Sequence, residues 1–320
     1  MLKGYIFSLT KQAVQLGFLP RMQILHTSTK EAGQVYIPFV NWAQYILVVA
    51  VVIGFGSSSA IASAYGMSVT GSMMVETIMT FFVIRYGWKY NLAGCIAATG
   101  VFLIVDIAFF SANALKFFSG GWFPLALSAC IFLLMYVWQR GRVAIRQSTE
   151  EQNIPLDGFL DSIFIAPPTQ VEGTAVYLNA KSAVVPRALM HNLLHNKVMH
   201  ERNVFLTVRT LDVPWVKFDQ RVKVESLGNN CFAVDVNYGF KNQPNIPKSL
   251  SLCAQYGLEF EEMETSYFLS RYTLLSDSSS KMPLWMERLF ASMIRNASDP
   301  AEYLGLPTNR VIELGAQIRI

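Results

Sequence analysis

The sequence predicts an α-helical membrane region followed by a soluble α/β domain. Charged residues make up only 15% of the 320 residues, whereas soluble domains average about 25%. These charges are sparse over residues 37–139 and ordinary over residues 140–320. Hydrophobic residues reach 52%, and the mean hydropathy is +0.32. We therefore expect lipid to surround one part of the chain and water the other.

Four apolar segments are each long enough to form a transmembrane helix. A bilayer's hydrocarbon core takes roughly 20 helical residues to cross. Segments of that kind occur at about residues 37–56, 60–84, 91–111 and 121–138. The loops between them are short, so neighbouring helices are expected to run antiparallel. Residues 37–139 are therefore the expected membrane region.

The segment before these helices, residues 1–36, has an apolar helical pattern that ends at Gly17 and Pro20. Two interpretations fit this pattern. It is either an amphipathic helix at the membrane surface or the end of a preceding transmembrane helix plus a cytoplasmic loop. We expect the second, because the pattern resembles the continuation of a longer apolar run.

Basic residues predict the orientation, because cytoplasmic loops carry an excess of lysine and arginine. The basic residues on the expected cytoplasmic side are Lys11, Arg21, Lys30, Arg85, Lys89, Arg140, Arg142 and Arg146. The two opposite loops hold only Lys116. We therefore expect a multi-pass protein of the cell inner membrane with a cytoplasmic C-terminal domain. The arginines after residue 139 are expected to contact anionic membrane lipid.

Beyond the membrane region we expect a juxtamembrane linker at residues 140–167 and a cytoplasmic α/β domain at residues 168–320. Alternating patterns predict strands at 173–179, 203–210, 266–275 and 310–320, helices at 186–195, 246–256 and 284–296, and a hairpin of 222–227 with 231–240. About 150 residues is a normal size for one core.

The sequence argues against several functions. The net charge of +4 is modest and no basic run with interleaved aromatic residues occurs, so no nucleic-acid partner is expected. No Walker loop, G-x-G-x-x-G or nucleophile elbow is present. The cysteines form no C-x-x-C pair and are expected to be reduced and structural. We expect no enzymatic activity and no bound cofactor.

A histidine series in the soluble half is the only candidate for a metal site. His191 and His195 are four residues apart on a predicted helix, and His200 follows. No acidic or cysteine ligand stands at a matching spacing, and the H-E-x-x-H pattern is absent. Helix packing and polar contacts explain these histidines better than zinc does, so no resident metal is expected.

Charged residues at bilayer depth are the strongest functional signal, because a carboxylate there costs a few kcal/mol or more without a partner or water. Asp106 lies well inside the third apolar segment, and Glu76 lies in the second. Asp106 either forms a structural hydrogen bond to a neighbouring helix or serves an ion- or proton-linked role. Glu76 either reaches toward the interface or takes part in function.

Two polar faces accompany these carboxyl groups. At 100° per residue, Ser68, Ser72 and Glu76 each lie within about 60° of Tyr65 on one helix face and form a polar stripe with it. By the same arithmetic, Thr99, Asp106 and Asn113 share a face of the next helix. Hydroxyl and carboxylate oxygens suit a dehydrated cation, so we expect both faces to line one wet cavity. Helix packing explains most of the other small residues in the second segment.

Long motifs along the chain resemble the bacterial Kup potassium transporters of the KUP/HAK/KT group. The residues that carry the resemblance are SLTKQAVQLGFLPRMQILHTS, GQVYIPFVNW, AYGMSVTGSM, VDIAFFSANALKFFSGGWFPL, EGTAVYLN, RALMHNLLHNKVMHER and PTNRVIELGAQIRI. They run nearly from one end of the chain to the other.

The resemblance implies potassium uptake by a potassium–proton symporter in the inner membrane, with a LeuT-like core of inverted repeats. K⁺ and H⁺ are then the transported ions. In this family the aspartate of the VD motif is implicated in transport, and the tyrosine of the AYG motif is linked to the cation site. Here these are Asp106 and Tyr65. Glu76 matches no motif of the family.

The resemblance also implies that this chain is a truncated form. Family members have about a dozen spans, and the early spans carry most of the cation site. We therefore expect the chain alone not to transport potassium, and to need a separately encoded N-terminal half or a homodimer partner. The alternative is a membrane-anchored regulatory or binding module with no transport of its own.

Overall fold

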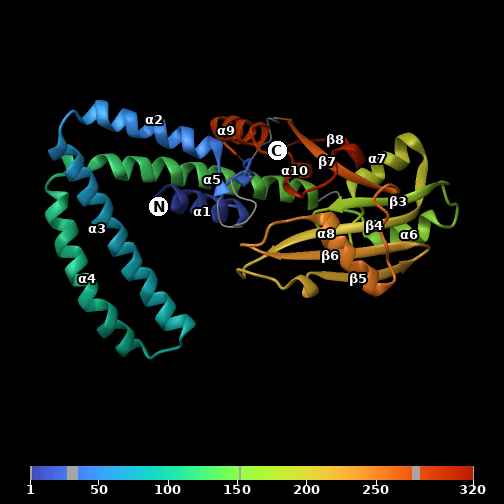
Figure 1. Ribbon diagram of the computed structural model, residues 1–320, viewed down its shortest axis with the longest axis horizontal. Helices are drawn as coiled ribbons and strands as arrows, with labels where there is room; N and C mark the ends of the chain where they lie inside the picture. The colour runs from blue at the N-terminus through green and yellow to red at the C-terminus, as the bar shows by residue number, and fades with distance from the viewer. Residues whose placement is uncertain (1, 27–34, 151–152, 276–281, 320) are drawn as a thin grey trace. The chain divides into compact units, whose positions relative to one another are not determined.

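The computed structural model describes residues 2–26, 35–150, 153–275 and 282–319 (Figure 1). The chain forms two compact units. One comprises Phe39–Leu134, and the other comprises Met1–Pro38 together with Met135–Ile320. The two units are described separately below.

The first unit is built from apolar helices. They are α2 (Pro38–Phe55), α3 (Ser58–Phe82), α4 (Leu92–Ala114) and the first part of α5 (Trp122–Glu150). All four helices are long and apolar enough to cross a membrane. Within each apolar stretch, the rest of the chain buries between 0% and 17% of the residues. Such uncovered apolar surface suits a lipid environment, and the four predicted helices are confirmed.

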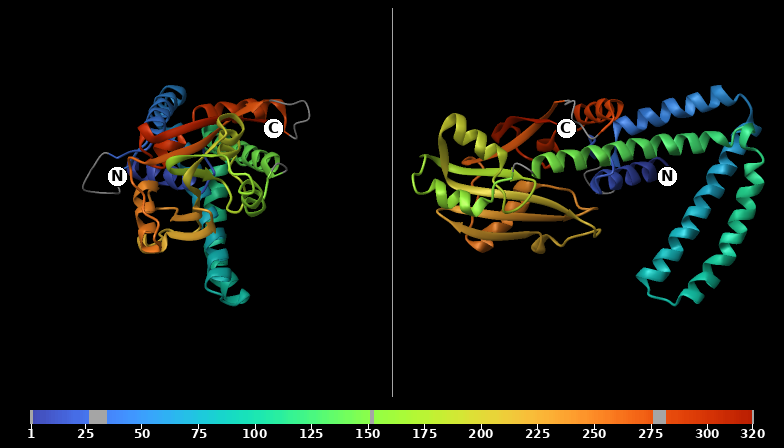
Figure 2. Two further views of the ribbon diagram at one scale, coloured as in Figure 1. Left: turned by 90° about the vertical axis from the view of Figure 1, so that its right-hand side faces the viewer. Right: turned by 180° about the vertical axis from the view of Figure 1, so that it is seen from behind.

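Helices α3 and α4 form an antiparallel hairpin in which the two helices run side by side (Figures 1 and 2). Ser57 caps α3 by accepting a hydrogen bond from the Ala60 amide, and Asn91 caps α4 in the same way through the Gly94 amide. A π-helical turn, Val83–Gly87, ends α3. These polar caps satisfy backbone donors that would otherwise be exposed at the helix ends.

Gly120 is a position where only glycine fits. Its φ is +131°, and a Cβ atom there would lie 2.5 Å from the carbonyl oxygen of Ala60 at the start of α3. The turn before α5 can therefore approach the backbone of α3 closely, as small residues allow in membrane proteins.

Helix α5 continues well beyond the predicted fourth span and ends at Glu150. The segment expected as a linker, residues 140–167, is therefore largely helical and also contains α6 (Leu156–Ile163). The reason is that no proline interrupts the helix before Pro155 and that apolar residues recur on one face. On that face Val137 packs with Phe290 of α9 (Leu284–Arg295).

The soluble domain contains a six-stranded sheet in the order β5-β6-β4-β3-β7-β8 (Figures 1 and 2). The strands are β3 (Thr169–Asn179), β4 (Val198–Leu211), β5 (Val222–Gly228), β6 (Cys231–Gly239), β7 (Thr265–Leu275) and β8 (Val311–Arg319). Neighbours are parallel except for β5 and β6, which form the predicted antiparallel hairpin. The α/β class of this domain is confirmed.

Helices cover both faces of this sheet. On one face, α6 and α7 (Arg187–Asn196) pack over Tyr177 and Phe205. On the other face, α8 (Ile246–Leu250), the 3₁₀ helix η4 (Ser251–Tyr256) and α10 (Pro300–Tyr303) pack over the remaining inward side chains. The predicted helix 246–256 is thus one α-helical turn that tightens into a 3₁₀ helix before Gly257.

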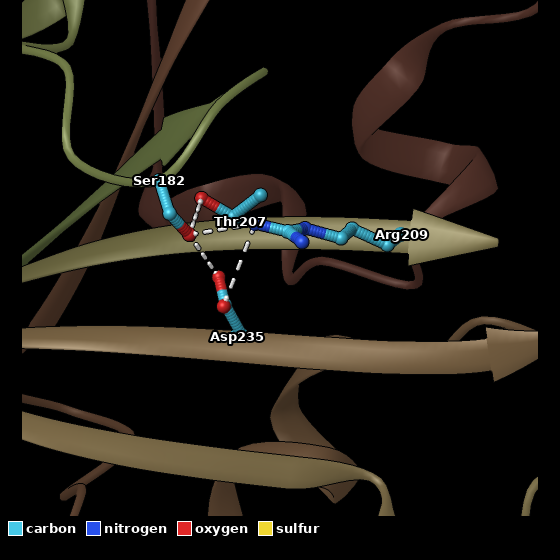
Figure 3. Close-up of polar contacts among 4 residues, drawn as sticks. All are labelled: Ser182, Thr207, Arg209 and Asp235. Carbon is cyan, nitrogen blue, oxygen red and sulfur yellow. Dashed lines mark hydrogen bonds and ion pairs between the residues drawn. The ribbon is translucent and has the colours of Figure 1, made fainter. Parts of the chain in front are cut away.

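Side-chain contacts hold a loop onto the first of these faces (Figure 3). Ser182, in the loop after β3, donates a hydrogen bond to Asp235 of β6 and accepts one of 3.1 Å from Arg209 of β4. Arg209 also lies 3.6 Å from the Asp235 carboxylate. Ser182 lies 3.4 Å from the hydroxyl of Thr207. The cluster fixes the β3–α7 loop where these strands approach their carboxyl ends.

The N-terminal residues belong to the same unit as the soluble domain. Helix α1 (Leu2–Gln15) is followed by a two-stranded pairing of β1 (Leu25–His26) with β2 (Val35–Tyr36). Gln15 donates a 3.0 Å hydrogen bond to the carbonyl oxygen of Asn242, and the Ser298 amide donates one of 2.8 Å to Arg21. The end of α1 and the chain after it therefore contact the domain through specific hydrogen bonds.

Gly141 of α5 gives a test of how α9 is packed. A Cβ atom at this position would overlap the ring of Phe290, which is fully buried. We expect Gly141→Ala to lower the free energy of unfolding by about 1–3 kcal/mol, because overpacking a dense core outweighs the gain in helix propensity. Thermal unfolding of the purified chain in detergent measures the change.

The matched control is Gly158→Ala in α6, where a Cβ atom would meet nothing within 4 Å. Alanine is the better helix former by roughly 1 kcal/mol, so this variant is expected to be at least as stable as the parent. A Gly141→Ala variant that is stabilised to the same extent would contradict the packing described.

Candidate functional site

Asp106 lies at the contact between α3 and α4. Its side chain is 4% exposed, although the residues around it on α4 are apolar. The hydroxyl of Thr77 on α3 donates a 2.5 Å hydrogen bond to one carboxylate oxygen. A buried carboxyl oxygen needs a hydrogen-bond donor from the protein, because the hydrocarbon of a bilayer supplies none. Thr77 is therefore the first partner that the structure gives to this carboxyl group.

Of the other two polar residues predicted on the face of Asp106, Asn113 contacts α3 and Thr99 is buried. Thr99 is buried, and its hydroxyl donates to the carbonyl of Cys95 on its own helix. Asn113 donates to the carbonyl of Phe109, and its side chain lies directly against Gly66 of α3, where a Cβ atom would overlap it. The structure thus brings Thr99, Asp106 and Asn113 to one side of α4, as the arithmetic predicted.

The stripe of Tyr65, Ser68, Ser72 and Glu76 lies on a different face of α3. All four side chains are exposed, and that of Tyr65 is 71% exposed. The face of α3 that packs on α4 instead carries Met67, Thr70 and Thr77. At 100° per residue the two faces are roughly half a turn apart. The structure does not bring the stripe together with Asp106, so the single cavity expected for both faces does not form between α3 and α4.

Sequence reasoning missed Thr77 and Gly66. Both lie on the packed face of α3. Gly66 stands as far before the turn at residues 88–91 as Asn113 stands after it, whereas Thr77 is about one helical turn closer to the turn than Asp106 is. Counting outward from the turn of an antiparallel hairpin pairs Gly66 with Asn113 and brings Thr77 only to within about one helical turn of Asp106. The adjacent Glu76 drew attention because it is charged, although it lies on the exposed face.

Outside the membrane helices, the structure gives the surroundings of the histidines and of two buried cysteines. His191 and His195 stack with ring centroids 6.0 Å apart, and no group of three metal-ligating side chains occurs among the residues that the structure describes. Burial lowers the pKa of His200, which packs edge-on against Phe268. Burial raises the pKa of the Cys231 and Cys253 thiols to about 12, which keeps them protonated and unreactive.

Thr77→Val tests the hydrogen bond to Asp106. Valine keeps the shape of threonine but leaves a buried carboxylate without this donor, so we expect a loss of about 1–3 kcal/mol in the free energy of unfolding. Thermal unfolding of the purified chain in detergent measures it. Replacing Asp106 by leucine in the Thr77→Val background should cost less than the sum of the two single changes, because the two residues interact.

Thr80→Val is the control for the loss of a hydroxyl from the same helix. Thr80 is exposed, and its hydroxyl bonds to the carbonyl of Glu76 on α3 itself. This change should stay within about 0.5 kcal/mol of the parent. If Thr77→Val were no more destabilising than Thr80→Val, the interaction with Asp106 would contribute nothing to the hairpin.

Comparison with known proteins gives the family of the chain. Residues 1–143 match the K⁺ potassium transporter integral membrane domain, and residues 172–320 match the K⁺ potassium transporter C-terminal domain. The chain is 54% identical to a protein of Methylibium petroleiphilum, 55% to one of Herminiimonas arsenicoxydans and 54% to one of Janthinobacterium sp.. Each is named a probable potassium transport system protein Kup.

Each of these alignments covers 98% of this chain and 50% of the relative. The chain therefore spans about half the length of the curated relatives it matches. With its apolar helices and the match to an integral membrane domain, it is an inner-membrane protein. Matches to both domain families and identities of 54–55% show that the chain belongs to the Kup family of the KUP/HAK/KT group.

Proposed function

We propose that the chain takes part in potassium uptake across the inner membrane, as part of a potassium–proton symporter. The observation that carries the proposal is the buried carboxyl group of Asp106 in an otherwise apolar helix. Ionisable groups at such positions are costly, and in membrane proteins they commonly mark ion or proton pathways. The names of the related proteins support potassium as the transported ion.

The chemistry of Asp106 suits this role. Its carboxyl group can bind a proton or face a monovalent cation, while Thr77 holds one of its oxygens in place. A purely structural hydrogen bond would need only an acceptor of the same shape, which asparagine also supplies. Charge and titration are therefore the properties that distinguish transport from packing at this position.

The exposed stripe of α3 supplies a second set of oxygens. In transporters built from inverted repeats, substrate sites form between repeats near the bilayer midplane. We propose a LeuT-like arrangement in which Tyr65, Ser68, Ser72 and Glu76 face the half of the transporter that is present in the relatives and not matched by this chain. In that arrangement Tyr65 contributes to the cation site, and Asp106 acts from the other side of α3.

The positions of basic residues support the orientation. Arg85 and Lys89 lie at the turn between α3 and α4, and Arg140, Arg142 and Arg146 follow the apolar part of α5. Under the positive-inside rule these segments are cytoplasmic. We therefore propose that the soluble domain, which follows α5, lies in the cytoplasm.

Asp106→Asn tests the transport proposal. The chain is joined to the N-terminal half of the Herminiimonas relative and expressed in cells that lack potassium uptake, on medium with limiting potassium. We expect the parent fusion to restore growth and Asp106→Asn to abolish it, because asparagine keeps the hydrogen bond from Thr77 but carries no charge. Potassium uptake and the accompanying proton entry are then measured in membrane vesicles.

Two measurements distinguish a folding defect from a transport defect. The amount of fusion protein in the membrane must equal that of the parent, and Asp212→Asn, an exposed change in the soluble domain, should leave growth unaffected. Full growth and uptake with Asp106→Asn would overturn a role for this carboxyl group. Potassium uptake without proton entry would overturn symport and leave the uptake proposal standing.

A further inference from the structure

A cavity of about 550 Å³ opens on the soluble domain, away from the membrane helices and from the residues of the candidate site. Its walls come from two loops that follow the carboxyl ends of the parallel strands β4 and β6, together with the start of α8. Open α/β sheets bind ligands at the carboxyl ends of their strands. The volume lies within the range of small-molecule sites, about 300–1,000 Å³.

The two loops are tied together by one asparagine. The side-chain oxygen of Asn242 accepts hydrogen bonds from the amides of Val216 at 2.9 Å and Gly239 at 2.8 Å. Gly239 is required here, because a Cβ atom would lie 2.5 Å from the carbonyl oxygen of Pro214. Beneath the cavity, the Tyr238 hydroxyl lies 2.7 Å from that of Ser249. The walls are therefore held in place without a ligand.

The charge in this cavity is positive. Arg221 and Lys248 line it, and no aspartate or glutamate is among the described lining residues. The guanidinium of Arg221 lies 5.4 Å from the ring centroids of both Phe218 and Tyr238, and the Lys248 ammonium lies 5.8 Å from that of Phe218. Across the part of the chain that the structure describes, neither cation forms a salt bridge. Cation–π contacts with these rings stabilise both side chains. They do not neutralise the positive charge as a carboxylate would.

An aromatic ring is available beside these charges. Trp215 lines the same cavity and is 65% exposed, although tryptophan is usually well buried. Arginine and lysine bind phosphate oxygens through charge-assisted hydrogen bonds. An exposed indole offers a face on which a planar base can stack. A simple anion would fill little of the volume and leave the indole unused.

We propose that this cavity binds an anion in which phosphate is joined to a planar ring, that is, a nucleotide. Its phosphate contacts Arg221 and Lys248, and its base stacks on Trp215. The loop that forms one wall also accepts the hydrogen bond from Gln15 of α1 through the carbonyl of Asn242. Occupancy therefore bears directly on the contact between the N-terminal helix and the soluble domain.

The test measures binding of radiolabelled ADP to the purified full chain in detergent by equilibrium dialysis. We expect saturable binding that Lys248→Gln and Trp215→Ala each weaken at least tenfold, since each removes one recognition element. Lys223→Gln is the matched control, because Lys223 is an exposed lysine of β5 that does not line the cavity. Arg221 is left unchanged, since its side chain also bonds to the Val216 carbonyl.

Two further measurements locate the site and define the ligand. Hydrogen–deuterium exchange should slow in residues 239–248 when ADP is added, and inorganic phosphate should bind at least tenfold more weakly than ADP. The proposal is overturned if no saturable binding occurs below about 1 mM ADP, the weak end of the affinity scale. It is also overturned if both variants bind as the parent does, or if phosphate binds as well as ADP.

Discussion

A carboxylate on an apolar helix has to find a partner, and in this protein that constraint governs how α3 and α4 pair. Lipid offers Asp106 no hydrogen-bond donor, so the hairpin must place Thr77 opposite it. The short turn between the helices fixes the register that does this. The fit of Asn113 against Gly66 belongs to the same register. Because apolar burial gives helices no drive to associate in lipid, these small and polar contacts define the hairpin.

In the soluble domain, which is surrounded by water, burial of apolar side chains stabilises the packing instead. There the parallel sheet is buried by helices on both faces, as parallel sheets require, and polar groups collect where β4 and β6 approach their carboxyl ends. Ser182, Arg209 and Asp235 satisfy one another on one face. Arg221 and Lys248 have no such carboxylate among the described residues and lie over aromatic rings instead. In the first cluster the polar and charged groups bond to one another, so its role is structural. In the second, the positive charge remains available to a ligand.

The sequence predicts the elements of this fold well, because length and composition decide them. The four apolar helices need only a count of apolar residues, and the β5–β6 hairpin needs only its turn at Gly228–Asn230. The pairing of Thr77 with Asp106 escaped prediction because helical arithmetic shows which residues share a face but not which face packs. The part of α5 beyond the predicted span packs on α9, with Gly141 against Phe290 and Ile145 in the same apolar cluster, and these contacts join segments far apart in the sequence. The cavity around Arg221 is likewise formed by loops that are separate in the sequence, so patterns within one element do not predict it.

Helix α3 carries two polar faces, and this arrangement bears on what surrounds it in the proposed transporter. One face packs on α4, where Thr77 bonds to Asp106 and Thr70 of the same face is buried. The other presents Ser68 and Ser72, small residues that permit close approach of another backbone, together with Tyr65 and Glu76. If only lipid bordered this side of the helix, its hydroxyls and its carboxylate would lie in hydrocarbon without hydrogen-bond partners, which is unfavourable. The composition of α3 therefore favours a central position with protein or an aqueous path on both sides, as the proposed symport mechanism requires.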